Sequence, residues 1–113
     1  MPPDVFIIGS GHIKFGRLEQ SLEDLIVEAG REAIAEAGIA PSDIDAVYLG
    51  HYNAGLVPAG FASSLILETD PGLRFKPAVR AENACASGSA AIHAWPNALG
   101  AGRARNVLVI GAE

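Results

Sequence analysis

Short apolar runs alternate with longer helical patterns along this chain of 113 residues. Four runs are expected to be strands, and they cover residues 5–8, 46–50, 77–82 and 107–110. The runs at 5–8 and 107–110 are apolar without polar alternation, as expected of strands that are buried on both faces. Helical patterns separate these runs, so the order of elements predicts βαβ units around a mostly parallel sheet.

The clearest helical pattern begins at Ser21 and ends near Gly38. Ser21 is followed three residues later by Asp24, as in a capping box, and apolar residues then recur at spacings of three and four. Gly30 inside this helix costs about 1 kcal/mol relative to alanine, which predicts that another element packs closely there. Two further helices are expected, one over about residues 59–68 and one after Cys85 to about Leu99.

Composition and charge narrow the class of protein. Half of the residues are apolar and 19% are charged, which fits one compact domain. Eight Lys and Arg against thirteen Asp and Glu give a net charge of -5, the wrong sign for a nucleic-acid binder. No apolar run approaches the ~20 residues of a membrane span, and the N-terminus lacks a basic signal region. We expect a cytoplasmic protein.

Two short motifs around glycine and serine lack residues that a dinucleotide-binding site or a serine nucleophile would require. Residues 9–11 follow the first apolar run as Gly-Ser-Gly, but a dinucleotide-binding fingerprint needs glycine at position 14, where Lys14 stands. Ser87 lacks the flanking glycines of a nucleophile elbow, because Cys85 and Ser89 occupy those positions. The single cysteine and three scattered histidines also lack zinc-ligand spacing, so no metal is expected.

Cys85 is the candidate catalytic residue. It stands where an apolar run passes into an Ala-rich helix, and a thiol in the first turn of a helix is stabilised as a thiolate. The alternative is an inert, buried thiol that only packs. His93 lies ~12 Å further along the helix and cannot reach the sulfur. His12 and His51 follow strands, where each could line a cleft or simply be a solvated loop residue.

The segment around Cys85 resembles the nucleophile segment of the thiolases, above all their acetyl-CoA acetyltransferase and sterol-carrier-protein-x branch. The core N-x-C-x-S-G lies here at residues 83–88, and the order and spacing of residues 15–16, 21–25, 35–39, 43–47 and 107–113 agree. From this resemblance we expect residues 1–113 to form the first βαβαβαβ portion of the N-terminal layered domain of a thiolase-like α/β fold.

The resemblance also implies a chemistry. In thiolases the cysteine that matches Cys85 takes an acyl group from an acyl-CoA, and its backbone N–H contributes to an oxyanion hole. Coenzyme A thioesters are then substrates, and no permanently bound cofactor is expected. Arg74, Lys76 and Arg80 are candidates for the coenzyme A phosphates, or are plain surface charges.

The resemblance to thiolases also implies partners for this chain, because some thiolase segments do not occur in it. The activating histidine and second cysteine of thiolases lie in segments that do not occur here. We therefore expect the same or another chain to supply the rest of the fold, the 113 residues to be inactive alone, and the protein to form a homodimer or homotetramer. The alternatives are a ketoacyl-synthase-like condensing enzyme and a non-catalytic structural module in which Cys85 only packs.

Overall fold

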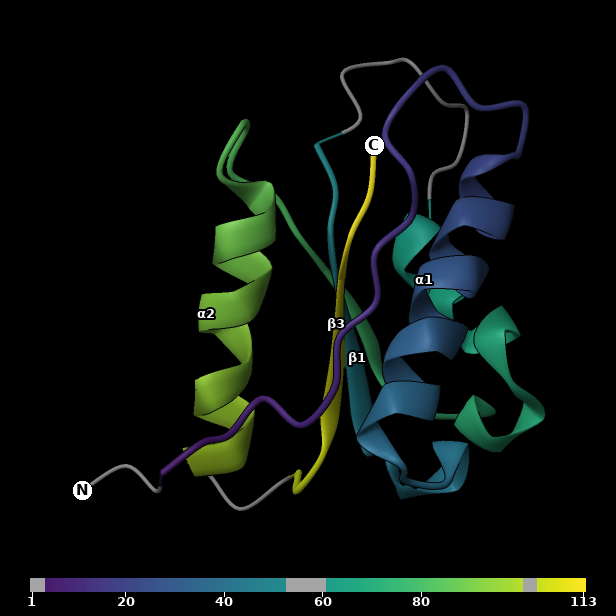
Figure 1. Ribbon diagram of the computed structural model, residues 1–113. Coiled ribbons are helices and arrows are strands. Elements are labelled where there is room, and N and C mark those ends of the chain that lie inside the picture. The colour runs from purple at the N-terminus through teal and green to yellow at the C-terminus, as the bar shows by residue number, and fades with distance from the viewer. Residues whose placement is uncertain (1–3, 53–60, 101–103) are drawn as a thin grey trace.

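A computed structural model describes residues 4–52, 61–100 and 104–113, which form a small parallel sheet between two helices (Figure 1). The sheet has the strand order β2-β1-β3, with β1 at Ala46–Gly50, β2 at Ala78–Ala81 and β3 at Val107–Gly111. Helix α1, Leu22–Ala37, covers one face, and α2, Ser87–Gly100, covers the other. Three short 3-10 helices complete the described elements: η1 (Pro41–Asp43), η2 (Ala62–Thr69) and η3 (Pro71–Leu73).

The hydrophobic core lies between the sheet and α1. Strand register puts Val47 opposite Leu108 and Leu49 opposite Ile110, so these four side chains share one face. All four are buried, together with apolar side chains from α1, η1, η2 and η3: Ile26, Ile34, Ile44, Ala62, Ile66 and Leu73. The apolar runs at 46–50 and 107–110 are therefore strands, as the sequence predicts.

Local signals predicted α1 to within a residue. The Ser21 hydroxyl accepts a hydrogen bond from the Asp24 N–H and caps the helix, and Gly38 ends it in the left-handed conformation with φ 70°. Close packing at Gly30 is also confirmed. A methyl group at this buried glycine would lie 3.0 Å from the Thr69 hydroxyl of η2.

The first apolar run differs from its prediction. Residues 5–8 form no strand, and their side chains are exposed, from 41% at Val5 to 87% at Ile7. Two glycines hold the segment that follows against α1 instead. A methyl group on Gly9 would lie 2.6 Å from the Ala33 carbonyl oxygen, and one on Gly11 would lie 2.6 Å from that of Ala29. No described strand pairs with residues 5–8, so the prediction of a strand there is wrong.

The second predicted helix is a 3-10 helix rather than an α-helix. Its first two predicted residues, 59 and 60, lie outside the described residues, and η2 covers Ala62–Thr69. At its start the Ser64 hydroxyl donates to the Phe61 carbonyl at 2.7 Å, and the Ser64 N–H bonds the same oxygen at 3.1 Å. This i to i+3 pattern satisfies the carbonyl locally and favours the tighter helix.

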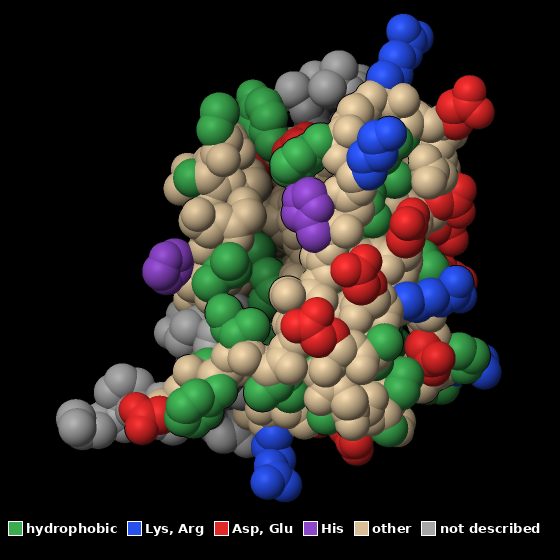
Figure 2. Space-filling model, viewed as in Figure 1, with side chains coloured by type: hydrophobic (Ala, Val, Ile, Leu, Met, Phe, Trp, Pro, Cys, Tyr) green, Lys and Arg blue, Asp and Glu red, His purple; other side chains and the backbone are tan. Residues whose placement is uncertain are grey.

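The surface divides by side-chain type. Acidic side chains gather over α1, whereas hydrophobic ones lie along the face between α2 and the N-terminal segment (Figure 2). Within the described ranges, no helix combines the length and apolar character that a membrane span requires.

Candidate active site

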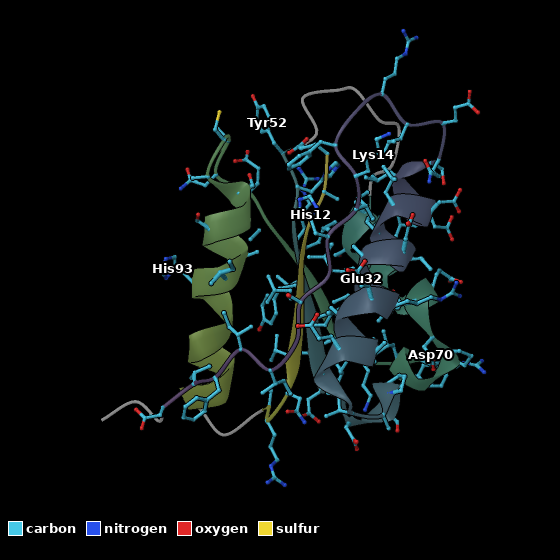
Figure 3. All side chains as sticks on the ribbon, viewed as in Figure 1. His12, Lys14, Glu32, Tyr52, Asp70 and His93 are labelled. Carbon is cyan, nitrogen blue, oxygen red and sulfur yellow. The ribbon has the colours of Figure 1, made fainter. Side chains whose placement is uncertain are left out.

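Polar residues collect at the carboxyl edge of the sheet, where all three parallel strands end. His51 and Tyr52 follow β1, the turn with Cys85 follows β2, and Glu113 follows β3. Tyr52 projects from this end of the sheet in Figure 3. Ligands of open α/β sheets bind outside the carboxyl ends of the strands, so this edge is the candidate site.

The turn that carries Cys85 stands before α2 rather than in its first turn. The helix begins at Ser87, and its first bond within the described backbone runs from the Ala90 N–H to the Ala86 carbonyl at 2.9 Å. Ala84 has a φ of 46°, which an α-helix cannot contain. Cys85 therefore lies two residues before the helix, and the prediction that it lies in the first turn is wrong. The thiol is exposed, so Cys85 is not the buried cysteine of the alternative interpretation.

Hydrogen bonds close the turn from three sides. The Ala86 N–H donates to the Asn83 carbonyl at 2.8 Å, which forms the turn itself. The Ser87 hydroxyl donates to the Ala84 carbonyl at 2.7 Å and accepts from the Asn83 N–H at 2.9 Å. The Glu82 carboxylate accepts from the Ala84 N–H at 2.7 Å. The backbone on both sides of Ala84 is therefore held.

A close backbone contact fixes the turn against the sheet. A methyl group on Gly50, the last residue of β1, would lie 2.6 Å from the Ser87 carbonyl oxygen and 2.8 Å from the Gly88 Cα atom. Only glycine permits the start of α2 to approach the strand this closely. Gly50 is thus a residue of the site that the sequence offered no reason to single out.

His51 is fully buried, which excludes the interpretation as a solvated loop residue. Its Nδ1 lies 2.8 Å from the Ala112 carbonyl oxygen, so Nδ1 carries a proton and donates to that oxygen. The guanidinium of Arg80 donates to the carbonyls of His51 and Tyr52 at 3.0 and 3.1 Å. The Glu113 carboxylate accepts from the Tyr52 N–H at 2.7 Å. Arg80 of β2 and the two residues that follow β3 thereby hold the two residues after β1.

Neither of the other histidines serves Cys85. His93 is exposed on α2 and points away from the sheet (Figure 3). His12 is exposed and stacks edge to face on Phe15 at 4.7 Å. Among the described residues no histidine is hydrogen bonded to Cys85, so no base for the thiol is identified there.

The three basic candidates for phosphate binding separate in space. Lys76 lies before β2, at the amino edge of the sheet, where its ammonium donates to the Ser42 carbonyl at 3.2 Å. Arg74 stands on Phe75 with its guanidinium carbon 4.8 Å from the ring centre. Arg80 alone reaches the carboxyl edge, and two of its nitrogens are already bonded to backbone carbonyls.

An open groove of about 570 Å³ lies at the amino edge, far from Cys85, between η1 and the residues before β3. Its Asp45 carboxylate accepts from the Arg105 and Asn106 N–H groups at 2.8 and 3.1 Å. Both bonds lower the pKa of Asp45 below its usual value, and the bond from Arg105 has the larger effect. Asp45 therefore fixes the backbone of the two residues that precede β3. The described part of the chain holds no cluster of metal-binding side chains.

The chain is similar in sequence to two groups of acyl-transferring enzymes, as judged by the names of its relatives. The chain is 47% identical over 112 residues to an acetyl-CoA acetyltransferase of Methanocaldococcus jannaschii, with 97% of this chain and 28% of the relative covered. It is 32% identical over 98 residues to a β-ketoacyl-[acyl-carrier-protein] synthase III of Clostridium perfringens, with 85% of this chain and 29% of that protein covered. The chain spans less than a third of the length of either relative.

A solved structure shares the fold. The Acat5 thiolase from Ascaris suum, crystallised with coenzyme A, superposes with a TM-score of 0.72 at 23% identity, over 91% of this chain and 28% of that one. The family model described as the N-terminal domain of thiolase matches residues 5–113, which include the sheet, both helices and the Cys85 turn. The chain therefore belongs to the thiolase family, whose N-terminal domain its residues 5–113 match.

Proposed function

We propose that the protein carrying this segment transfers acyl groups between coenzyme A thioesters, with Cys85 as the nucleophile. The observation that carries the proposal is the place of Cys85. Its exposed thiol stands on a held turn at the carboxyl edge of the sheet, inside the part of the chain that matches the thiolases. A nucleophile requires both access and a fixed orientation, and this turn supplies both.

The chemistry follows from the thiolate. The sulfur of Cys85 attacks the thioester carbonyl carbon, and the bond from that carbon to the sulfur of coenzyme A then breaks. Coenzyme A leaves as a thiol once it has taken a proton, and the acyl group stays on Cys85. The Cys85 N–H is proposed to stabilise the oxyanion of the intermediate. Coenzyme A as the substrate is supported by the thiolase of similar fold that was solved with it.

The 113 residues are proposed to form part of one layer of a larger enzyme and to have no activity alone. No histidine among the described residues is hydrogen bonded to Cys85, and the matched part of the chain covers 28% and 29% of the two named relatives. Purified as it stands, the chain should show no acetyl-CoA acetyltransferase turnover above background. Turnover by the chain alone would contradict this part of the proposal.

The acyl-enzyme itself is the test of the main proposal. The complete protein that carries the segment is incubated with acetyl-CoA, digested and analysed by mass spectrometry. The expected result is one acetyl group on the peptide that contains Cys85, and its loss in Cys85→Ser. Full activity with an unlabelled Cys85, or equal activity of Cys85→Ser, would sink the proposal.

A ketoacyl-synthase-like condensing enzyme is the second candidate, because the relative from Clostridium perfringens carries that name. It would form the same acyl-cysteine but hand the acyl group to a substrate on acyl carrier protein. Comparing coenzyme A and acyl carrier protein as acceptors separates the two. A third candidate, a structural module with an unused thiol, predicts no acylation from either.

Assembly and compartment are proposed on the same basis. Strand β2 forms an edge of the sheet and its Val79 is 46% exposed, which leaves room for a second copy in a homodimer or homotetramer. The cytoplasm is the proposed compartment, because a catalytic thiol must stay reduced.

A further inference from the structure

Ser87 is a buried polar residue whose hydroxyl binds the two residues before Cys85. Its exposed fraction is 4%. The hydroxyl donates to the Ala84 carbonyl and accepts from the Asn83 N–H, at 2.7 and 2.9 Å. Both its donor and its acceptor capacity are thus used inside the turn. The side chain cannot itself meet a substrate, because it has no open surface.

The backbone that Ser87 holds includes a residue in a strained conformation. Ala84 is in the left-handed region, at a φ of 46°, which a residue with a Cβ atom disfavours. Two other bonds reach this residue. The Ser87 N–H donates to the Ala84 carbonyl at 3.2 Å, and the Ala84 N–H donates to Glu82, whose side chain is exposed, so that water competes for this bond. The Ser87 hydroxyl is the buried side-chain contact that opposes relaxation of Ala84, and Cys85 is the next residue along the chain.

Ser87 is also the residue through which the turn meets the sheet. Its carbonyl oxygen lies where a side chain on Gly50 would have to be, so the backbone of Ser87 is pressed against the end of β1. A continuous path of contacts therefore runs from β1 to Ser87, from its hydroxyl to Ala84, and on to Cys85.

We propose that Ser87 is a positioning residue for the acyl-transfer step, acting through Ala84 to orient the thiol of Cys85. The inference rests on the proposed function, since it concerns the orientation in which Cys85 attacks a thioester. Loss of the hydroxyl should let the turn relax, which misplaces the sulfur but leaves it exposed. A misplacement of the order of 1 Å lowers the rate of such a step by roughly 10-fold to 100-fold.

The experiment compares Ser87→Ala with Ser89→Ala in the complete protein that carries the segment. Ser89 lies on the first turn of α2, is exposed and makes no hydrogen bond through its side chain to another described residue. Acylation of Cys85 is followed in single turnover over a range of acetyl-CoA concentrations, below the melting transitions of all variants. Alkylation of Cys85 by iodoacetamide is measured alongside.

Ser87→Ala should lower the maximal acylation rate at least tenfold, with the half-saturating acetyl-CoA concentration and the alkylation rate changed less than threefold. A merely structural role would alter the melting temperature and leave the maximal rate of the folded protein alone. Ser89→Ala should match the wild type. An unchanged maximal rate in folded Ser87→Ala would overturn the proposal. Should that variant not fold, Ser87→Thr, which keeps the hydroxyl, must acylate within threefold of the wild type, and a tenfold loss would overturn it.

Failure of the proposed function has a different signature, namely a wild-type protein that takes no acyl group. Amide hydrogen exchange at Asn83 then decides the role of Ser87. Exchange that is at least tenfold faster in Ser87→Ala than in Ser89→Ala supports a turn held by the hydroxyl, and equal exchange rejects it.

Discussion

Replacing Gly50 by alanine should destabilise the protein and displace the turn that carries Cys85. The added methyl group would lie 2.6 Å from the carbonyl oxygen of Ser87 and 2.8 Å from the Cα atom of Gly88. Ordinary van der Waals contact begins at 3.4 Å, so the start of α2 must move by several tenths of an ångström. Both neighbours are backbone atoms, which cannot rotate out of the way as a long side chain would.

The magnitude follows from two opposing effects. An extra methyl group in a packed interior costs about 1–3 kcal/mol. Alanine also restricts the unfolded chain more than glycine does, which returns roughly 0.4–1 kcal/mol. We therefore expect the free energy of unfolding to fall by about 1–2 kcal/mol. For a chain of this size that is a fall in Tm of roughly 4–15 °C.

Gly111→Ala is the matched control. Gly111 is the residue of β3 that pairs in register with Gly50, and a methyl group there would meet nothing within 4 Å. Its stability should stay within about 0.5 kcal/mol of the wild type. Urea denaturation followed by circular dichroism gives the free energies, and the iodoacetamide reaction rate of Cys85 reports on the turn. Equal stability and equal thiol reactivity in the two variants would refute the close contact between β1 and α2.

Two further predictions concern the ends of elements. Ser21→Ala removes the hydroxyl that caps α1 and should lower the free energy of unfolding, measured by thermal denaturation, by about 1 kcal/mol. Ser42 has an exposed side chain, so Ser42→Ala should change that free energy by less than about 0.5 kcal/mol. Equal losses in the two variants would contradict the role of Ser21 as the helix cap. Asp45 has a pKa below its usual 3.8 because the backbone N–H of Arg105, and then that of Asn106, donates to the ionised carboxylate. A lowered pKa in the folded state stabilises the fold above pH 3.8, and this stabilisation is lost as the pH falls through the folded value. Asp45→Asn should therefore be less stable than the wild type at neutral pH and approach it in acid, and a stability difference that is constant with pH would contradict this.

Elements whose signals are local could be predicted from the sequence alone. Ser21 and Gly38 bound α1 because a cap depends only on residues within one turn of the helix end. Strands β1 and β3 followed from continuous apolar runs, a pattern that is typical of strands covered on both faces. The prediction of close packing at Gly30 succeeded for the same reason: a glycine inside a helix is costly without a neighbour.

The apolar run at 5–8 marks the limit of such reasoning. Its pattern is that of a buried strand, yet Ile7 is 87% exposed. Whether an apolar run becomes a strand depends on a partner that donates and accepts its backbone hydrogen bonds, and the pattern of the run itself contains no information about that partner.

The candidate site also has some features that the sequence predicted and others that depend on the tertiary structure. The sequence by itself determined that Cys85 is the residue to test, through its small neighbours and the N-x-C-x-S-G core, and it determined which end of the sheet would carry it. Only the tertiary structure decided how the thiol is held. The left-handed Ala84, the hydroxyl of Ser87 and the contact with Gly50 depend on where β1 and α2 meet. These two elements are more than thirty residues apart in the chain, so no local pattern specifies the distance between them.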